Sequence, residues 1–165
     1  MSPLLRSGVL TALATLILDQ ALKIWLLTGF DLGHRGVVPV LPFFDLVLAW
    51  NTGISYGWFS QSGPTGQMVL VAVKAVAVVA LAVWMAKSQT RLATVALGLI
   101  IGGAIGNAVD RFAYGAVVDF ALLHANIGGR AYNWYVFNLA DVAIVAGVAA
   151  LLYDSFFGPT AAKAP

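Results

Sequence analysis

Four long apolar runs alternate with two more polar stretches along the chain. The runs cover residues 9–27, 67–85, 92–109 and 136–153. Each is close to the roughly 20 residues that an α-helix needs to cross the hydrocarbon core of a bilayer. The pattern therefore predicts a membrane all-α fold with four transmembrane helices.

The two polar stretches, residues 30–66 and 114–135, are too broken by Gly and Pro or too polar to span a bilayer. In the first, residues 37–40 and 43–50 are rich in β-branched and aromatic residues, and residues 51–53 (Asn-Thr-Gly) are typical of a turn. We therefore expect a small extramembrane β-sheet on the membrane surface. Three aromatic side chains are expected at the depth of the lipid head groups: Tyr56, Trp58 and Phe59.

The composition agrees with a membrane protein. The chain is 61% hydrophobic and only 10% charged, whereas a soluble domain has about 25% charged residues. Its 165 residues fit one integral membrane domain over residues 1–165. The first run is not interpreted as a cleaved signal peptide, because Asp19, Gln20 and Lys23 lie in its distal half and no small-residue cleavage site follows.

Small residues recur at helical spacing in the third run. Gly98, Gly102 and Gly106 are four residues apart, a pattern that allows another helix to approach closely. The same theme continues in the last run at Ala143, Gly147 and Leu151. We interpret both patterns as helix packing.

Four spans place both termini on one side of the membrane. The basic residues Arg6, Lys87, Arg91 and Lys163 would share that side, and the positive-inside rule makes it cytoplasmic. Asp19 would lie slightly below the outer face. This topology brings eight polar residues together near the outer face: Lys23, Asn51, Asn107, Asp110, Arg111, Asp119, Asn138 and Asp141.

Several classes of function are disfavoured by composition. The chain has no Cys, so thiolate catalysis and Cys-type zinc sites are excluded. With two histidines and a formal net charge of +2, we expect no metal site, no cofactor and no nucleic-acid partner. All seven acidic residues are Asp, so each Asp beside an apolar segment is a candidate functional group.

Asp119 and Asp141 are the candidate catalytic pair. Asp119 follows the third run, and Asp141 lies in the first turn of the fourth. If those helices are neighbours, one carboxylate can take a proton from water while the other donates one, as in aspartic proteases. Asn107 and Arg111, at i,i+4, could hold substrate carbonyls or orient the pair.

Each of these residues also has a purely structural interpretation. Asp141, three residues after Asn138, could cap a helix, and Asn51 could be a turn residue. Asp110 and Arg111 could form an interfacial ion pair. Asp19 and Lys23, at i,i+4, can pair on one helix face and would then support either the fold or the site.

The spacing of the polar residues alone leaves two other classes of function open. A proton-coupled transporter of four spans would also carry intramembrane carboxylates, although its key carboxylate is expected near the bilayer midplane. A structural membrane scaffold would leave the buried charges without a purpose.

Five short motifs occur in a fixed order along nearly the whole chain. They are Asp19-Gln20-x-x-Lys23, Asn51-x-Gly53-x-x-Tyr56-Gly57, Gly102-Gly103-Ala104-Ile105-Gly106-Asn107-x-x-Asp110-Arg111, Val117-Val118-Asp119-Phe120 and Phe137-Asn138-x-Ala140-Asp141. In these motifs the chain resembles the lipoprotein signal peptidases (signal peptidase II). One motif alone is weak, but five in this order are highly specific.

The resemblance implies a four-helix aspartic endopeptidase of the bacterial inner membrane with a small sheet on the periplasmic side. Such an enzyme cleaves the signal peptide of prolipoproteins before a diacylglyceryl-modified cysteine. Its catalytic residues would be Asp119 and Asp141. Polar or site-lining roles would fall on Asn51, Gly53, Asn107, Arg111 and Asn138, with Asp19 and Lys23 in support.

The resemblance also implies the partners. They are lipid-modified prolipoprotein signal peptides, membrane lipid and the cyclic peptide antibiotic globomycin as an inhibitor, and we expect the chain to act as a monomer. Residues 121–136, between the two aspartates, are where members of the family are expected to differ.

Overall fold

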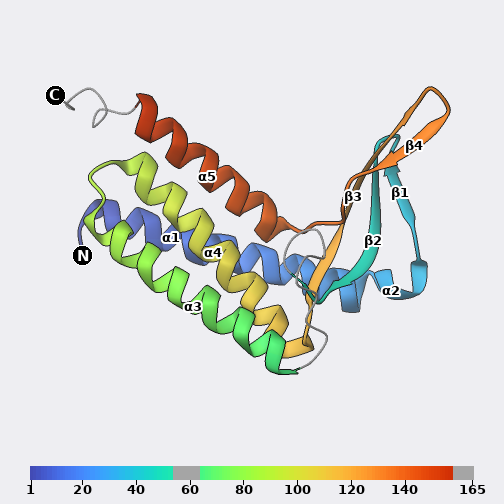
Figure 1. Cartoon of the computed structure of the whole chain (residues 1–165), viewed down its shortest axis with the longest axis horizontal. Coiled ribbons are helices and arrows are strands. Elements are labelled where there is room, and N and C mark those ends of the chain that lie inside the picture. The colour runs from blue at the N-terminus through green and yellow to red at the C-terminus, as the bar shows by residue number, and fades with distance from the viewer. Residues whose placement is uncertain (54–63, 158–165) are drawn as a thin grey trace. The chain divides into compact units, whose positions relative to one another are not determined.

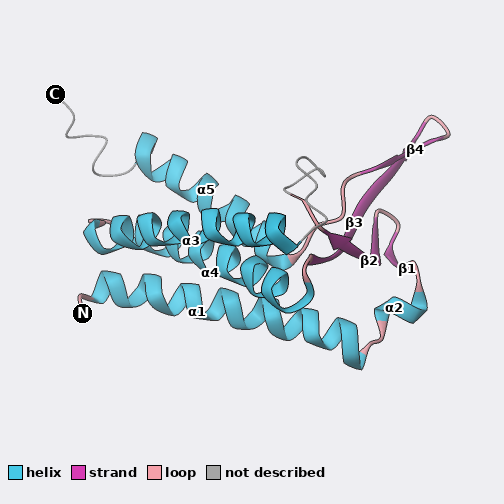
Figure 2. Cartoon of the chain, turned by 60° about the horizontal axis from the view of Figure 1, so that its bottom comes forward, coloured by secondary structure: helices cyan, strands magenta, loops and turns pink. Residues whose placement is uncertain are grey.

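The computed structural model describes residues 1–53 and 64–157, so Tyr56, Gly57, Trp58 and Phe59 lie outside the described residues. Within these ranges, four helices are long and apolar enough to cross a membrane. The elements, in chain order, are α1 Pro3–Ile24, a π-helical turn Trp25–Gly29, α2 Leu32–Arg35, β1 Val38–Leu41, β2 Phe44–Asn51, α3 Pro64–Lys87, α4 Arg91–Tyr114, β3 Val117–Ile127, β4 Arg130–Asn133 and α5 Leu139–Phe157 (Figures 1 and 2).

The chain divides into two compact units. The helical unit comprises Met1–Asp19, Ala72–Gly106 and the described part of Leu139–Pro165. Its central helix is α4, because 61% of the apolar window of α4 is buried, against 22% for α1 and α5 and 6% for α3. The other three helices therefore leave most of their apolar surface on the outside of the unit.

Glycines allow α4 to approach its neighbours closely. A Cβ atom added at Gly98 or Gly102 would collide with carbonyl oxygens of α1, those of Gly8 and Ala12. One added at Gly103 would lie 2.6 Å from a carbonyl oxygen of α5. The predicted stripe of small residues is thus confirmed as helix packing.

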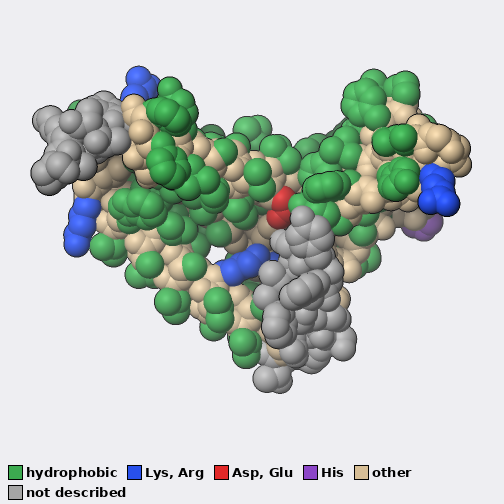
Figure 3. Space-filling model, turned by 45° about the horizontal axis from the view of Figure 1, so that its top comes forward, with side chains coloured by type: hydrophobic (Ala, Val, Ile, Leu, Met, Phe, Trp, Pro, Cys, Tyr) green, Lys and Arg blue, Asp and Glu red, His purple; other side chains and the backbone are tan. Residues whose placement is uncertain are grey.

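The outward faces of these helices are apolar. Val76 of α3 is 73% exposed and Val145 of α5 is 65% exposed, and hydrophobic side chains cover much of the visible helical surface in Figure 3. An apolar surface of this extent is unfavourable in water and suits contact with lipid. The four predicted spans are confirmed in number and chain order.

The sheet unit comprises the described parts of Gln20–Val71 together with Asn107–Asn138. It contains four antiparallel strands in the order β1-β2-β3-β4. In the register of β2 and β3, Ala49 lies opposite Asp119 and Asn51 opposite Val117. This pairing brings the end of β2 beside the start of β3, where the buried residues of β3 are concentrated.

The second polar stretch also contributes strands to the sheet, which the sequence pattern did not predict. β3 and β4 are joined by Gly128 and Gly129, whose φ angles are +60° and +78°. Positive φ at both central residues is the requirement of a type I′ hairpin turn, and glycine meets it without steric cost. The small sheet expected from the first stretch therefore has four strands.

Several predicted helix ends are wrong. α1 begins at Pro3 rather than near residue 9, α3 begins at Pro64 rather than near residue 67, and α5 ends at Phe157 rather than near residue 153. α5 begins at Leu139 rather than near residue 136, because Phe137 still exchanges backbone hydrogen bonds with Ala121 at 2.8 and 3.0 Å. α4 continues to Tyr114 rather than ending near residue 109. Polar residues in its last turns are buried with hydrogen-bond partners, so they do not terminate the helix.

Candidate active site

Asp119 is a buried carboxylate near the start of β3. Its Oδ2 accepts a hydrogen bond from Asn51 Nδ2 at 3.0 Å, and its Oδ1 accepts one from Asn138 Nδ2 at 2.6 Å. A carboxylate held through both oxygens has a defined orientation. The structure therefore brings three of the predicted site residues together.

Asn51 is a turn residue, as the sequence suggested, and it also contacts Asp119. Its Oδ1 accepts a hydrogen bond from the Gly53 backbone N–H at 3.0 Å, which closes a turn of the type that Asn favours. Its Nδ2 is the donor to Asp119. The turn therefore fixes the side chain that orients the carboxylate.

Asn107, in the last third of α4, connects two further predicted residues. Its Oδ1 accepts hydrogen bonds from Lys23 Nζ and from Asn138 Nδ2, both at 3.1 Å. All three side chains are buried. Asn138 thus donates to both Asp119 and Asn107, which uses both N–H groups of its amide.

Asp110, which the sequence suggested could pair with Arg111, is a buried carboxylate that pairs with Lys23 instead. Its Oδ2 lies 2.7 Å from Lys23 Nζ and accepts from the Val118 backbone N–H at 3.1 Å, and its Oδ1 accepts from Gln20 Nε2 at 2.8 Å. Val118 directly precedes Asp119, so this carboxylate also anchors the backbone of β3. The spacing of these residues could have indicated the network. Gln20 and Lys23 are three residues apart and share a helix face, and so do Asn107 and Asp110.

Arg111 holds the turn that follows β2. Its Nη2 donates to the Gly53 carbonyl oxygen at 2.6 Å, and its Nη1 donates to the Asn107 carbonyl oxygen at 3.3 Å. The side chain is only 5% exposed. The guanidinium therefore links α4 to the backbone of the predicted site.

Asp19 and Asp141 belong to the helical unit. Asp19 is fully buried, and its Oδ1 accepts a hydrogen bond from the Ala140 backbone N–H at 3.0 Å. A Cβ atom at Gly106 would lie 2.6 Å from its Oδ2, so glycine leaves room for this carboxylate. Asp141, the residue after Ala140, is half-buried in the first turn of α5, as predicted.

Neither histidine belongs to these networks. His34 Nδ1 lies 2.8 Å from Asp31 Oδ1 at the surface, and His124 Nε2 lies 3.2 Å from Asp45 Oδ2. Across residues 1–53 and 64–157, no group of three or more His, Cys, Asp or Glu side chains could hold a metal ion. The polar groups brought together are carboxylates, amides, one ammonium and one guanidinium.

Comparison with known proteins identifies the family. The family model for signal peptidase (SPase) II matches residues 11–157. The chain is 74% identical over 160 residues to the lipoprotein signal peptidase of Rhodopseudomonas palustris, covering 97% of this chain and 98% of that protein. It is 72% identical over 165 residues to the lipoprotein signal peptidase of Nitrobacter hamburgensis, covering both chains completely.

Solved structures agree in fold. A bacterial membrane enzyme determined in meso at 2.3 Å resolution has a TM-score of 0.71 and 28% identity, over 95% of this chain and 91% of that chain. A second, at 1.9 Å resolution, has a TM-score of 0.73 and 27% identity, over 91% of this chain and 92% of that chain. From its four apolar helices, its small antiparallel sheet and these similarities, the chain belongs to the signal peptidase II family of lipoprotein signal peptidases.

Proposed function

We propose that the chain is an aspartic endopeptidase of the bacterial cytoplasmic membrane that removes signal peptides from prolipoproteins. It cleaves before the diacylglyceryl-modified cysteine and uses Asp119 and Asp141 to activate water. The substrate class rests on the family and on the name that the relatives carry. The observation that best supports the chemistry is the buried Asp119 carboxylate, oriented by the amides of Asn51 and Asn138.

The covalent chain supports a site that contains both aspartates. Asp141 is three residues from Asn138, whose amide donates to Asp119 at 2.6 Å. Three residues span at most about 11 Å even when fully extended. From the family, we propose that the two carboxylates share one water molecule and one scissile bond, within the single peptidase domain that the sequence predicts.

The proposed reaction is a general acid–base hydrolysis. One aspartate takes a proton from water while the water oxygen attacks the scissile carbonyl carbon. The other aspartate, protonated at the start, donates its proton to the carbonyl oxygen. The tetrahedral intermediate then collapses and the C–N bond breaks: the aspartate that took the water proton gives it to the leaving amine, and the other aspartate recovers a proton from a hydroxyl of the intermediate. One aspartate ends protonated and the other ionised, so the pair is regenerated.

The remaining predicted residues position this pair. Arg111 holds the carbonyl of Gly53 and thereby the turn that presents Asn51 to Asp119. Asn107 receives hydrogen bonds from Lys23 and Asn138. These contacts are pre-organised within the fold, which lowers the cost of orienting catalytic groups when substrate binds.

Asp19 has an equivalent role for Asp141. Its carboxylate accepts from the N–H of Ala140, in the first turn of α5. A negative charge at a helix N-terminus interacts favourably with the helix dipole. We propose that Asp19 fixes the orientation of this turn, and with it the side chain of Asp141.

The charge distribution supports an outward-facing site. A Cβ atom at Gly8 would lie 2.8 Å from the Thr94 carbonyl oxygen, so the start of α1 lies beside the start of α4. Arg6, Lys87 and Arg91 therefore belong to one end of the helical unit, which the positive-inside rule makes cytoplasmic. The other end, with Asp19 and Asp141, then lies toward the periplasm.

The direct test is cleavage of a defined substrate by the purified protein. We expect it to release the signal peptide from a prolipoprotein that carries the diacylglyceryl group, and globomycin to inhibit the release. The same precursor without the lipid is the matched control and should be cleaved far more slowly. Equal cleavage of both precursors would contradict the proposed substrate class.

A further inference from the structure

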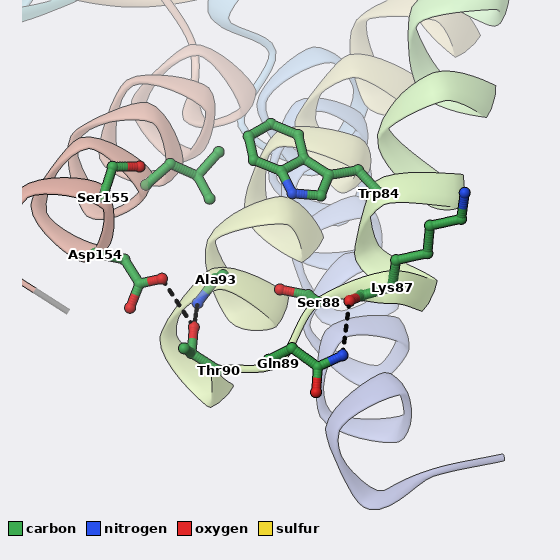
Figure 4. A pocket seen from close by; sticks show the side chains of 9 residues that line it. Trp84, Lys87, Ser88, Gln89, Thr90, Ala93, Asp154 and Ser155 are labelled. Atoms are coloured by element: carbon green, nitrogen blue, oxygen red, sulfur yellow. Dashed lines mark hydrogen bonds between the residues drawn. The ribbon is translucent and has the colours of Figure 1, made fainter. Parts of the chain in front are cut away.

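A cavity of about 390 Å³ lies at the end of the helical unit that carries the α3–α4 loop. Figure 4 shows its walls: Asp154 and Ser155 come from α5, Trp84 and Lys87 from α3, and Ser88 and Thr90 from the loop. At about 30 Å³ per water molecule, the volume holds about a dozen waters. None of these residues takes part in the proposed peptidase site.

This cavity lies at the depth of the lipid head groups. α3 ends at Lys87, α4 begins at Arg91 and α5 ends at Phe157, and all three are candidate spans. The ends of membrane helices meet the boundary between hydrocarbon and head groups. Tryptophan is enriched at that boundary, and Trp84 is half exposed there.

One wall of the cavity suits a cation. Thr90 Oγ1 accepts a hydrogen bond from the Ala93 N–H at 3.0 Å, so its single proton points to Asp154 Oδ2 at 2.9 Å. A carboxylate has about four lone-pair sites, so Asp154 can accept further hydrogen bonds from a ligand. The Trp84 indole lines the same cavity and can stack against a cation through its ring face.

The rim suits an anion. Lys87, which lines the cavity, is exposed at the end of α3. In Figure 4 the Lys87 ammonium is directed away from Asp154, so the two side chains are not paired with each other. A ligand with an ammonium inside the cavity and a phosphate outside would match both sets of charges.

We propose that this cavity binds the phosphoethanolamine head group of a membrane phospholipid, with the ammonium on Asp154 and Trp84 and the phosphate at the basic rim. A phosphatidylglycerol head group brings no cation to Asp154. A choline head group has no N–H to donate to the carboxylate. Phosphatidylethanolamine is therefore the lipid that the cavity selects.

The test compares three lipids on the intact protein. The protein is extracted from nanodiscs that contain phosphatidylethanolamine, phosphatidylcholine and phosphatidylglycerol in equal amounts, and the retained lipids are measured by native mass spectrometry. A charge-assisted hydrogen bond contributes about 1.5–3 kcal/mol, so we expect about a tenfold or greater preference for phosphatidylethanolamine. Added phosphatidylethanolamine should also raise the Tm in detergent, because it binds the folded state.

Asp154→Asn is the diagnostic variant. Asn keeps the shape and the acceptor for Thr90 but loses the charge, so we expect the lipid preference to disappear while the fold is retained. Trp84→Leu should weaken retention, and Asp31→Asn, a surface carboxylate remote in sequence from the cavity, should behave as the parent protein. Equal retention of the three lipids, or an unchanged preference in Asp154→Asn, would overturn the proposal. So would an equal rise in Tm with soluble phosphoethanolamine, since the ligand would then not be a lipid.

Discussion

The ammonium of Lys23 lies 2.7 Å from Asp110 Oδ2, and both side chains are buried, with exposed fractions of 2% and 1%. Gln20 and the Val118 N–H supply further hydrogen bonds to the same carboxylate. Removing one partner of a buried charge pair strongly destabilises the fold, because the remaining charge is left buried and uncompensated. The pair joins α1 to α4 next to the strand that carries Asp119.

The first prediction is that Lys23→Met lowers the free energy of unfolding by about 3–5 kcal/mol. Asp110→Asn should cost a comparable amount, and the double variant should cost less than the sum of the two. Chemical denaturation in detergent, arranged as a double-mutant cycle, measures the coupling. Arg130→Gln, at an exposed cation, is the control. Strict additivity of Lys23→Met and Asp110→Asn would show that the pair contributes no interaction energy.

The second prediction concerns Asp19. Asp19→Ala removes the acceptor of the Ala140 N–H, and leaving that group unsatisfied costs about 1–3 kcal/mol. We expect kcat for prolipoprotein cleavage to fall while KM changes little, because the first turn of α5 is loosened. Asp19→Asn keeps an acceptor oxygen and should recover part of kcat. A normal kcat for Asp19→Ala would show that Asp141 does not depend on Asp19.

The third prediction is that Arg111→Lys stays impaired in cleavage. A single ammonium cannot reproduce two guanidinium hydrogen bonds that diverge to the carbonyls of Gly53 and Asn107. Steady-state kinetics at matched protein levels measure the effect. Wild-type kinetics for Arg111→Lys would reduce the role of this residue to its charge.

The fourth prediction concerns pH at the surface of the sheet unit. The hydrogen bond that the His34 ring donates to the Asp31 carboxylate, together with the charge of that carboxylate, raises the pKa of His34 above its ordinary value of 6.5. The protonated ring therefore stabilises the turn at α2 at low pH, and this contribution is lost as the pH rises through the raised pKa. Imidazole NMR titration should show a raised value that returns toward 6.5 in Asp31→Asn. A titration curve unchanged by this substitution would contradict the assignment.

The apolar runs predicted the four spans because span length and hydrophobicity are local properties of the chain. The helix ends were less predictable, since they depend on partners distant in sequence. Phe137 delays the start of α5 by pairing with Ala121. Asp110 and Arg111 remain in the helix because their buried charges have partners. Lys23 pairs with Asp110, and the Gly53 carbonyl accepts a hydrogen bond from Arg111. No local pattern contains those contacts.

The sheet was only half predicted. Residues 117–127 begin with a buried apolar segment and are followed by Gly128-Gly129, which is a hairpin signal in its own right. The site residues were predicted mainly through the family resemblance, whereas spacing alone left Asn51 as a turn residue. The contacts of Asp110 with Gln20 and Lys23 were not predicted, because those partners lie about 90 positions away in the sequence.

The central claim is that Asp119 and Asp141 act as one catalytic pair. Their Asn variants keep the side-chain shape but cannot exchange a proton. The measurement is the rate of signal-peptide release from a lipid-modified prolipoprotein by purified Asp119→Asn, Asp141→Asn and the double variant, with Asp31→Asn as the matched control and Tm recorded for each. We predict that each single variant loses at least about a thousandfold in rate with the fold retained, and that the double variant loses hardly more, because the two residues act as a unit. Near-normal cleavage by either single variant at matched protein levels would contradict the mechanism, and loss of the parent activity to EDTA would point instead to a metallopeptidase.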